Sequence, residues 1–327
     1  MDVHVTGGAG FIGSRLVRRL VSEGHDVTVL DNVSRGRVTN LDPVADSIEF
    51  IEGDIKEYQS VEAAIDSPDL VYHLAAVNGT KNFYDSPVDV MEVNVSGVQN
   101  VIRAVRNSDC DRLVFASSSE VYGYPTTFPT PESHPLQIMD PTNSRFSYAG
   151  SKILGEQYVV NGLEQTNTGF TILRPHNVYG EAMGEDHVIP EFIEQIVTDI
   201  PFTIYGDGEQ TRSFCYIDDA VDGFYRAGTS PSAASGIYNI GTQDEITINE
   251  LAERLFAIAG FSPEVEHTDS QELEGSTRRR QPDISRARDE LGYEPAVSLD
   301  EGLQQTFDWY CEYFTGESAA QWRNSEQ

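Results

Sequence analysis

The feature that most constrains the fold is a set of glycines spaced three residues apart near the start of the chain. Gly7, Gly10 and Gly13 follow a short β-rich run at Val3–Thr6 and open an apolar-periodic helix at Phe11–Ser22. Gly7 permits a tight turn after the strand, Gly10 lets backbone N–H groups approach a pyrophosphate, and Gly13 lets helix and strand pack closely. A strand, a glycine turn and a helix in this order predict the dinucleotide-binding part of a doubly wound α/β fold.

Strands and helices alternate along the first half of the chain. Further strands are expected at Asp26–Leu30, Ile48–Glu52, Leu70–His73, Leu113–Ala116 and Phe170–Leu173, and helices at Val88–Arg106 and Tyr148–Gln165. This alternation predicts a Rossmann-type parallel sheet that is covered by helices on both faces. The turn-rich stretch 123–144 is too long for a simple connection, so we expect it to be a functional loop beside the site.

The pattern becomes irregular after Pro175. Helices are expected at Val188–Thr198, Asp218–Gly228, Asn249–Ala259 and Leu299–Phe314, and strands at Phe202–Tyr205 and Ile237–Ile240. We therefore expect a Rossmann domain made of residues 1–175 plus about 217–241, and a smaller mixed α/β substrate lobe made of residues 176–216 and 242–315. The tail 316–327 is polar and is expected to fray.

The charge of the chain excludes some partners. There are 22 basic and 53 acidic residues, a formal net charge of −31, and such a surface repels nucleic acid and anionic lipid. We therefore expect no nucleic-acid partner and no membrane association. Lysine occurs only at positions 56, 81 and 152, and an acidic, lysine-poor surface is typical of salt-adapted proteins. We favour a halophilic protein over an ordinary acidic one, because self-repulsion at this charge needs screening by salt.

The cysteines and the N-terminus indicate the cellular compartment in which the protein is expected. The three cysteines are widely spaced and show neither a zinc pattern nor a disulfide framework, so we expect no metal and a reducing environment. The N-terminus enters a strand pattern directly, without the apolar region of a signal peptide. We therefore expect a cytoplasmic protein.

Acidic residues end two of the predicted strands. A carboxylate at Asp31 can accept both ribose hydroxyls and would repel a 2′-phosphate, which favours NAD over NADP. Arg35 and Arg37 follow shortly and could accommodate a phosphate, so NADP stays open. Asp54 and Ile55 end the third strand, where they could hold adenine, although Asp54 could equally cap a helix.

A tyrosine and a lysine form a candidate catalytic pair. Tyr148 and Lys152 stand at positions i and i+4, which share one face of a helix. A neighbouring ammonium favours the phenolate, so that tyrosine can remove a hydroxyl proton as hydride leaves the same carbon. The strand end at 115–119 lies upstream and offers serine hydroxyls that could hydrogen-bond the reacting oxygen.

These motifs together resemble the extended short-chain dehydrogenase/reductase family, and within it the NAD-dependent nucleotide-sugar epimerases, dehydratases and decarboxylases. The resemblance runs from residue 1 to about residue 310. It rests on the glycine loop and on residues 54–55, 73–76, 94, 117–123, 148–152, 174–180, 206–212 and 280–283. It implies NAD as cofactor, a nucleotide-sugar substrate and a homodimer formed through the helices at 88–106 and 148–165.

The resemblance also implies roles for individual residues. Ser118 matches the catalytic Ser/Thr, Tyr148 the base and Lys152 the residue that stabilises the phenolate and binds ribose, and Glu120 is a further catalytic candidate. The implied cofactor contacts are Gly7, Gly10, Phe11, Ile12, Gly13, Asp31, Asn32, Asp54, Ile55, Leu74, Ala75, Ala76, Asn94, Tyr148 and Lys152. The implied substrate contacts are Ser119, Asn177, Arg212 and Arg280. Arginine forks suit the oxygens of a diphosphate, although Arg280 could instead belong to a solvated basic cluster at 278–280.

The reaction itself is left open by the motifs. Ser119 stands where a glucose-type 4,6-dehydratase carries an aspartate, whereas Glu120 with Arg212 resembles the decarboxylases and the GDP-mannose dehydratases. The runs 174–180, 183–184 and 187–190 resemble a branch of epimerases. The main expectation is a UDP-sugar 4-epimerase that uses a transient 4-keto intermediate and recycled NAD. The alternatives are a UDP-glucuronate decarboxylase, an NDP-sugar 4,6-dehydratase and, more remotely, a catalytically silent NAD-binding regulator.

Overall fold

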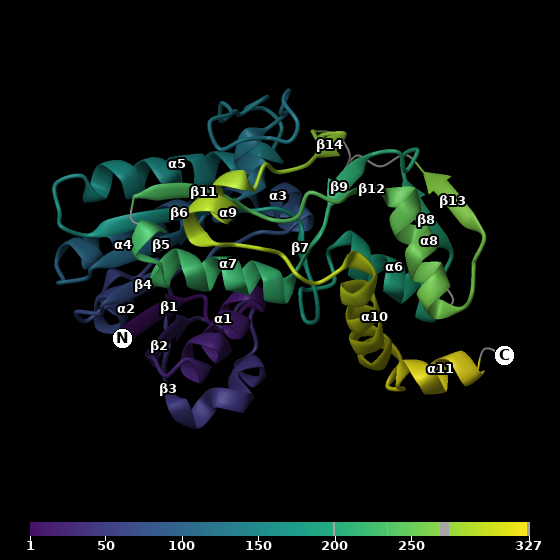
Figure 1. Ribbon diagram of the computed structural model, residues 1–327, viewed down its shortest axis with the longest axis horizontal. Helices are drawn as coiled ribbons and strands as arrows, with labels where there is room; N and C mark the ends of the chain where they lie inside the picture. The colour runs from purple at the N-terminus through teal and green to yellow at the C-terminus, as the bar shows by residue number, and fades with distance from the viewer. Residues whose placement is uncertain (199, 234, 269–274, 326–327) are drawn as a thin grey trace.

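The centre of the protein is a parallel sheet. The computed structural model describes residues 1–198, 200–233, 235–268 and 275–325, and within them seven strands are ordered β11-β6-β5-β4-β1-β2-β3 (Figure 1). The strands are β1 (Asp2–Thr6), β2 (Asp26–Asp31), β3 (Ile48–Glu52), β4 (Leu70–His73), β5 (Arg112–Ala116), β6 (Gly169–Pro175) and β11 (Gly236–Ile240). All pairs are parallel, and the winding direction reverses between β1 and β4. The predicted doubly wound Rossmann-type fold is therefore confirmed.

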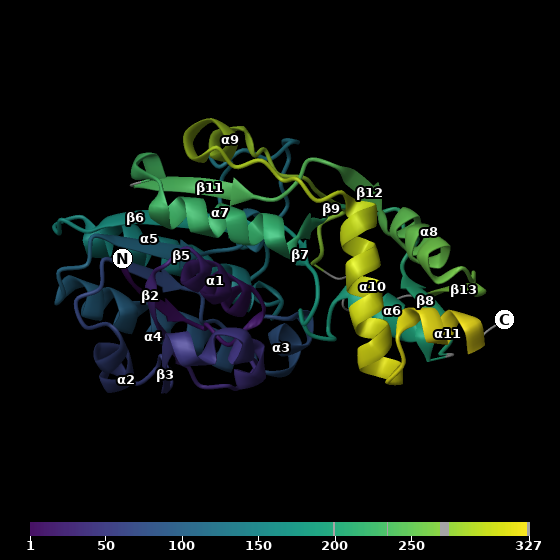
Figure 2. The same ribbon diagram turned by 60° about the horizontal axis from the view of Figure 1, so that its bottom comes forward.

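Helices cover both faces of this sheet (Figures 1 and 2). One face carries α1 (Phe11–Ser22) and α7 (Ile217–Thr229), which pack on each other. The other face carries α2 (Tyr58–Ala64), α4 (Pro87–Arg106) and α5 (Phe146–Leu163). Because both faces are covered, the central strands are apolar runs, and every residue of β4 is buried. Three short elements pack on these helices, namely η1 (Val38–Ser47) on α1, α3 (Thr80–Asp85) on α4 and η2 (Ser119–Tyr122) on α5.

The second lobe packs helices around three small sheets (Figure 2). Its helices are α6 (Val188–Val197), α8 (Ile248–Ala259) and α10 (Leu299–Thr315). The sheets pair β7 (Val178–Tyr179) with β10 (Cys215–Tyr216), β8 (Phe202–Tyr205) with β13 (Val265–Thr268), and β9 (Thr211–Ser213) with both β12 (Glu245–Thr247) and β14 (Arg279–Arg280). One helix that our division assigned to this lobe, α9 (Ser285–Leu291), packs instead against β11 and α7 of the Rossmann domain.

The C-terminal tail differs from the prediction. We expected residues 316–327 to fray, but a further helix, α11, spans Ala319–Ser325. Ala319 and Trp322 are buried, and the Trp322 ring lies 6.0 Å from that of Phe307 on α10. Two anchors three residues apart thus fix a segment whose composition is otherwise polar. None of the helices in the described part of the chain combines the length and apolarity that a membrane span needs.

Candidate active site

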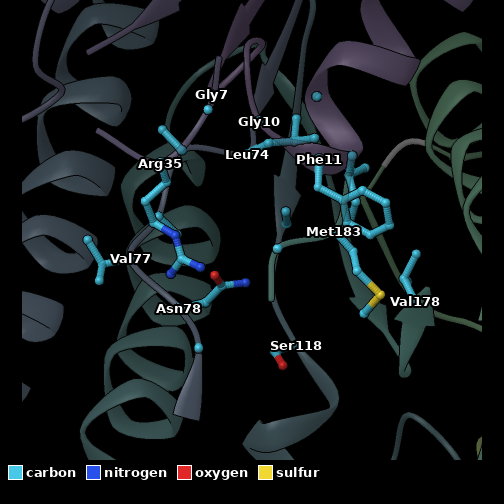
Figure 3. Close-up of a pocket in the computed structure, with 18 of the residues that line it drawn as sticks. Gly7, Gly10, Phe11, Arg35, Leu74, Val77, Asn78, Ser118, Val178 and Met183 are labelled. Carbon is cyan, nitrogen blue, oxygen red and sulfur yellow. The ribbon is translucent and has the colours of Figure 1, made fainter. Parts of the chain in front are cut away.

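A cleft of about 890 Å³ lies where the carboxyl ends of the sheet strands meet the second lobe. It includes the point at which the sheet changes winding direction, the place where α/β sheets bind their ligands. Figure 3 shows part of its wall, with Gly7 and Ser118 at opposite ends of the view. Of the predicted site residues, every one except Asn94 lines this cleft.

The glycine loop after β1 leaves no room for side chains. Gly7 has a positive φ of 75°, and a Cβ there would lie 2.6 Å from the backbone nitrogen of Ala75. A Cβ on Gly13 would lie 2.1 Å from the carbonyl oxygen of Gly7. The N-terminus of α1 is therefore bare and faces the cleft, and this cradle fits the diphosphate of a dinucleotide.

Two carboxylates line the cleft near the carboxyl ends of β2 and β3. The Asp31 carboxylate accepts hydrogen bonds from the backbone N–H groups of Ala9 (2.9 Å) and Val33 (2.8 Å), so its position at the end of β2 is fixed. A carboxylate can accept about four hydrogen bonds, so Asp31 keeps the capacity to accept ribose hydroxyls. The Asp54 carboxylate accepts from the backbone N–H of Lys56 at 2.8 Å, so it closes a local turn and also lines the cleft.

Asn94 is the predicted cofactor residue that does not line the cleft, and its contact with the cofactor stays a prediction. Its side chain is buried and accepts a hydrogen bond from the Val77 N–H (2.8 Å), while its amide donates to the Val77 carbonyl (3.1 Å) and to Ser151 Oγ (3.0 Å). Asn94 therefore ties the loop after β4 to α5. It shapes the wall of the cleft without reaching its surface.

The predicted catalytic side chains converge at one end of α5. Tyr148 and Lys152 are both buried on the side of α5 that faces the cleft, and the Lys152 ammonium lies 5.7 Å from the centre of the Tyr148 ring. Lys152 donates a hydrogen bond to the Ala116 carbonyl at 2.7 Å, and Tyr148 stacks on Phe83 with ring centres 4.9 Å apart. The Ser118 hydroxyl hydrogen-bonds to Tyr148. This set has the geometry to remove a hydroxyl proton from a bound alcohol.

Burial shifts the acidity of both members of the pair. Burial raises the pKa of Tyr148 above its ordinary value, and the hydrogen bond from Ser118 opposes that rise only in part. Burial lowers the pKa of Lys152 to about 7, although Glu156 raises it. The phenol is therefore protonated in the protein alone, so further positive charge beside it is needed before it can act as a base.

The lowered pKa of Lys152 predicts a pH-dependent stability. A buried lysine with a lowered pKa destabilises the fold fully below about pH 7, and this cost disappears above the pKa of an unfolded lysine, about 10.4. Lys152→Met should therefore raise the melting temperature of the cofactor-free protein relative to wild type near pH 6.5. The difference should shrink steadily up to pH 10, and a difference that is constant across this range would contradict the assignment.

Three arginines surround one carboxylate next to the catalytic side chains. Glu120 accepts a hydrogen bond from Arg280 at 2.9 Å and lies 3.7 Å from a terminal nitrogen of Arg145. Burial alone would raise the pKa of Glu120, but Arg280 and Arg145, and more weakly Arg212, lower it to about 2. Glu120 is therefore ionised at neutral pH. The cluster as a whole carries excess positive charge.

Arg212 carries the charge in this cluster that no carboxylate neutralises at close range. Its guanidinium donates to the Thr211 carbonyl (2.7 Å) and to Ser276 Oγ (3.1 Å), and among the described residues no carboxylate lies within 4 Å of it. Burial and the nearby Arg280 lower the pKa of Arg212 to about 9. Asn177 lines the same region and donates to the Ser213 carbonyl at 3.0 Å. This end of the cleft is therefore suited to an anion.

The loop at 123–144 supports the site from outside. We expected a functional loop, but none of its described side chains lines the cleft. The Thr130 N–H donates to the Gln281 carbonyl (2.8 Å), and the Asp283 N–H donates to the Thr130 carbonyl (2.9 Å). The loop therefore holds the segment that carries Arg280.

The sequence prediction missed several residues that line the cleft. The sequence indicates Arg35 only as a contact for a 2′-phosphate, yet its terminal nitrogens lie 3.4 Å from where a Cβ on Gly79 would stand, so it reaches the loop after β4 (Figure 3). Trp309, Tyr310 and Tyr313 reach the cleft from α10. The only signal for these aromatics is their spacing on one helix face, which equally describes an ordinary core face.

Comparisons with known proteins agree on one family. A family model described as the NAD dependent epimerase/dehydratase family matches residues 3–241. A putative UDP-glucose 4-epimerase of Methanocaldococcus jannaschii is 36% identical, over 94% of this chain and 97% of that protein. A UDP-N-acetyl-alpha-D-glucosaminuronate decarboxylase of Bacillus cytotoxicus is 32% identical, over 94% and 97%. The structure of a Thermus thermophilus UDP-glucose 4-epimerase complex with NAD superimposes with a TM-score of 0.84 at 30% identity, over 95% of this chain and 99% of that one.

Proposed function

Because this chain belongs to the NAD-dependent epimerase/dehydratase family, it is an NAD-dependent enzyme, and we propose that it interconverts a UDP-hexose with its C4 epimer. The similarity to a putative UDP-glucose 4-epimerase and to the NAD complex of a UDP-glucose 4-epimerase supports this reaction. The observation that carries the proposal is the engagement of Glu120 by two arginines, because it argues against the competing reactions.

The protein residues supply the proton chemistry of this reaction. NAD, held by the glycine loop and Asp31, would supply a hydride acceptor for oxidation at C4 of the sugar and a hydride donor for reduction on the opposite face. Tyr148 accepts the proton of the C4 hydroxyl, and Lys152 and Ser118 stabilise the phenolate that does so. Arg212 and Asn177 hold the diphosphate, so the sugar ring can turn between the two hydride transfers while the nucleotide stays in place.

The state of Glu120 separates the candidate reactions. Dehydration needs a base that removes a carbon-bound proton, and a carboxylate whose pKa is lowered to about 2 is a weak base. Decarboxylation needs an arginine that can grip a substrate carboxylate, but Arg280 and Arg145 already contact Glu120. If Arg212 binds the diphosphate, epimerisation is the candidate reaction that requires no change in the contacts of Glu120 with Arg280 and Arg145.

Decarboxylation is the second candidate because the same cluster carries excess positive charge. A uronate carboxylate could displace Glu120 from Arg280, and the Bacillus cytotoxicus relative is named a decarboxylase. After oxidation at C4, the bond between C5 and the carboxylate would break, its electrons would pass to the 4-keto group as an enolate, and a proton would then add at C5. The products would be CO₂ and a 4-keto pentose.

Product analysis distinguishes the two reactions. Purified protein should convert UDP-galactose and UDP-glucose into one another, as followed by NMR, and should form no pentose from UDP-glucuronate by mass spectrometry. Glu120→Gln keeps the side-chain length and should slow epimerisation by about tenfold or less. Appearance of UDP-xylose or its 4-keto form would overturn the epimerase and establish the decarboxylase.

We also propose a homodimer formed through α4 and α5, which pack side by side. Val88, Met91 and Leu154 are large apolar side chains exposed on these two helices. Exposed apolar side chains gathered on neighbouring helices are typical of a subunit interface. Light scattering should give twice the chain mass of 36.2 kDa, and Leu154→Arg should shift the protein towards monomer. A monomeric wild type would contradict the interface.

We further propose that the protein is adapted to high salt, because its formal net charge is −31. Repulsion between like charges destabilises the folded state. Salt shortens the distance over which this repulsion acts, from about 10 Å at 0.1 M to about 3 Å at 1 M. The melting temperature should therefore rise between 0.1 M and molar KCl. A melting temperature that stays flat or falls would show that the acidity is incidental.

A further inference from the structure

A buried hydrogen-bond network lies behind the arginine cluster, and Asn239 is at its centre. Asn239 stands near the end of β11, the edge strand of the sheet in Figure 1, and is fully buried. Its amide donates to the carbonyls of Thr130 and Asp283, both at 3.0 Å. Its Oδ1 accepts from the Tyr122 hydroxyl at 2.7 Å and hydrogen-bonds to Nε2 of His176 at 3.2 Å. An asparagine side chain has two N–H donors and an oxygen with two lone pairs, so its whole capacity is used.

The amide of Asn239 fastens the segment that carries Arg280. One of the two carbonyls that it reaches belongs to the residue three positions after Arg280. At the same strand end a Cβ on Gly241 would lie 3.0 Å from Pro282 Cγ, so the segment packs closely on β11. On its other side Arg280 lies on β14, in register with Arg212 of β9. The position of Arg280 therefore depends on β9 and on the end of β11 together.

The oxygen of Asn239 reaches η2, the short helix that carries Glu120. Tyr122 lies two residues after Glu120 on η2, and its hydroxyl donates to Asn239. The same hydroxyl accepts from Arg174 at 2.9 Å, and Arg174 forms an ion pair with Glu156 of α5. The network therefore extends from the helix that carries the catalytic pair, through η2, to Asn239.

His176 fixes the orientation of the Asn239 amide. Burial, and after it the charge of Arg280, lowers the pKa of His176 to about 3, so the ring is neutral at neutral pH. Because Oδ1 of Asn239 can only accept, the ring proton lies on Nε2 of His176. The amide nitrogen thus faces two carbonyls and the amide oxygen faces two donors. Neither an aspartate nor a leucine at this position would provide both sets of contacts.

We propose that Asn239 is a positioning residue that holds Arg280 against Glu120 and thereby raises the affinity of the cleft for the diphosphate of a sugar nucleotide. The members of the Arg280–Glu120 pair lie 160 residues apart in the chain, and Asn239 joins the two segments that carry them. Arg280 lines the cleft beside Arg212, so the charges of both arginines are available to one anion. An arginine that is held in place before binding avoids the cost of being ordered on binding. The proposal deepens the proposed function and rests on its sugar-nucleotide substrate.

The test measures the binding of UDP to the NAD-loaded protein by calorimetry. UDP carries the diphosphate but no sugar, so no turnover accompanies binding. Asn239→Ser is too short to keep the four contacts and should weaken UDP binding by about tenfold. In the Arg280→Gln background the same substitution should weaken UDP binding by less than about twofold, because the residue through which Asn239 acts has already been removed.

Tyr122→Phe is a milder variant of the same test. It keeps the ring and removes the hydroxyl that joins η2 to Asn239, so it should weaken UDP binding by about threefold. This loss should also be absent in the Arg280→Gln background. Tyr122→Phe keeps the proposal testable where Asn239→Ser fails to fold.

A matched control is Thr171→Val on β6, the strand that pairs with β11. Thr171 is fully buried, and its hydroxyl also donates to two backbone carbonyls, at 2.7 and 3.4 Å. The control should lower the melting temperature and leave the affinity for UDP unchanged. A merely structural role of Asn239 predicts either unchanged UDP affinity in the folded variants or equal losses with and without Arg280, and both results would overturn the proposal. If the variants behave as expected but UDP-glucuronate yields a pentose, the proposed epimerase fails and the role of Asn239 stands.

Discussion

Tyr148→Phe should lower turnover of the sugar nucleotide by at least about a hundredfold while leaving NAD bound. General-base groups contribute about 10²–10⁴-fold, and phenylalanine keeps the ring that stacks on Phe83. The fold and the wall of the cleft should therefore be preserved, and only the hydroxyl that faces Ser118 is lost. The measurement is the rate of epimer formation by NMR together with the NAD content of the same preparation.

The matched control for this prediction is Ser118→Ala. It removes the hydrogen bond to Tyr148 but leaves the base in place, so its loss of turnover should be smaller than that of Tyr148→Phe. If Tyr148→Phe turned over substrate at a near-normal rate with NAD bound, another group would have to be the base. If Tyr148→Phe lost NAD, its hydroxyl would have the cofactor-binding role that the resemblance implies for Tyr148, and the lost turnover would not identify the base.

The sheet and the cofactor cradle could be predicted because their signals are local. The turn after β1 needs glycine at Gly7 and Gly13 for reasons of backbone contact, and the structure places both where a Cβ would collide with backbone atoms. The strands of a buried parallel sheet are short apolar runs between turns, so they are visible in the sequence. The predicted ends differ from the observed ends by a few residues, as at β6, which continues to Pro175.

The arrangement of the arginine cluster could not be predicted, because its partners are far apart in the chain. Glu120 and Arg280 are separated by 160 residues, and Arg37 and Tyr313 by 276. Sequence motifs indicate that such residues face one cleft but not which pairs touch. The contacts of Glu120 with Arg280 and Arg145, on which the proposed reaction depends, are therefore not visible in the sequence.

Asn94 and α11 illustrate two further reasons why parts of the structure could not be predicted from the sequence. The resemblance to a family assigns Asn94 to the cofactor, but the sequence does not show that its side chain also ties the loop after β4 to α5 through Val77 and Ser151. The tail that forms α11 is polar on average, and composition hides the two buried side chains, Ala319 and Trp322, that hold it. In both cases packing, rather than local preference, decides the structure.

The largest effect on stability is expected at a buried ion pair behind the catalytic helix. Arg174 at the end of β6 donates to both carboxylate oxygens of Glu156 on α5, at 2.9 and 2.7 Å, and both side chains are almost fully buried. The Ser117 hydroxyl also donates to Glu156, at 2.5 Å. The pair therefore fixes the helix that carries Tyr148 and Lys152 against the sheet.

Arg174→Met should lower the free energy of unfolding by about 3–5 kcal/mol, because it leaves the Glu156 carboxylate buried without a cation. The double variant Arg174→Met with Glu156→Leu removes both charges and should recover much of this loss, since replacing a buried pair by apolar side chains of similar size is often neutral. Urea denaturation of the wild type, both single variants and the double variant measures the coupling directly. If the double variant is no more stable than Arg174→Met, the stabilisation comes from other contacts of Arg174, such as its hydrogen bond to Tyr122 at 2.9 Å, and not from the ion pair.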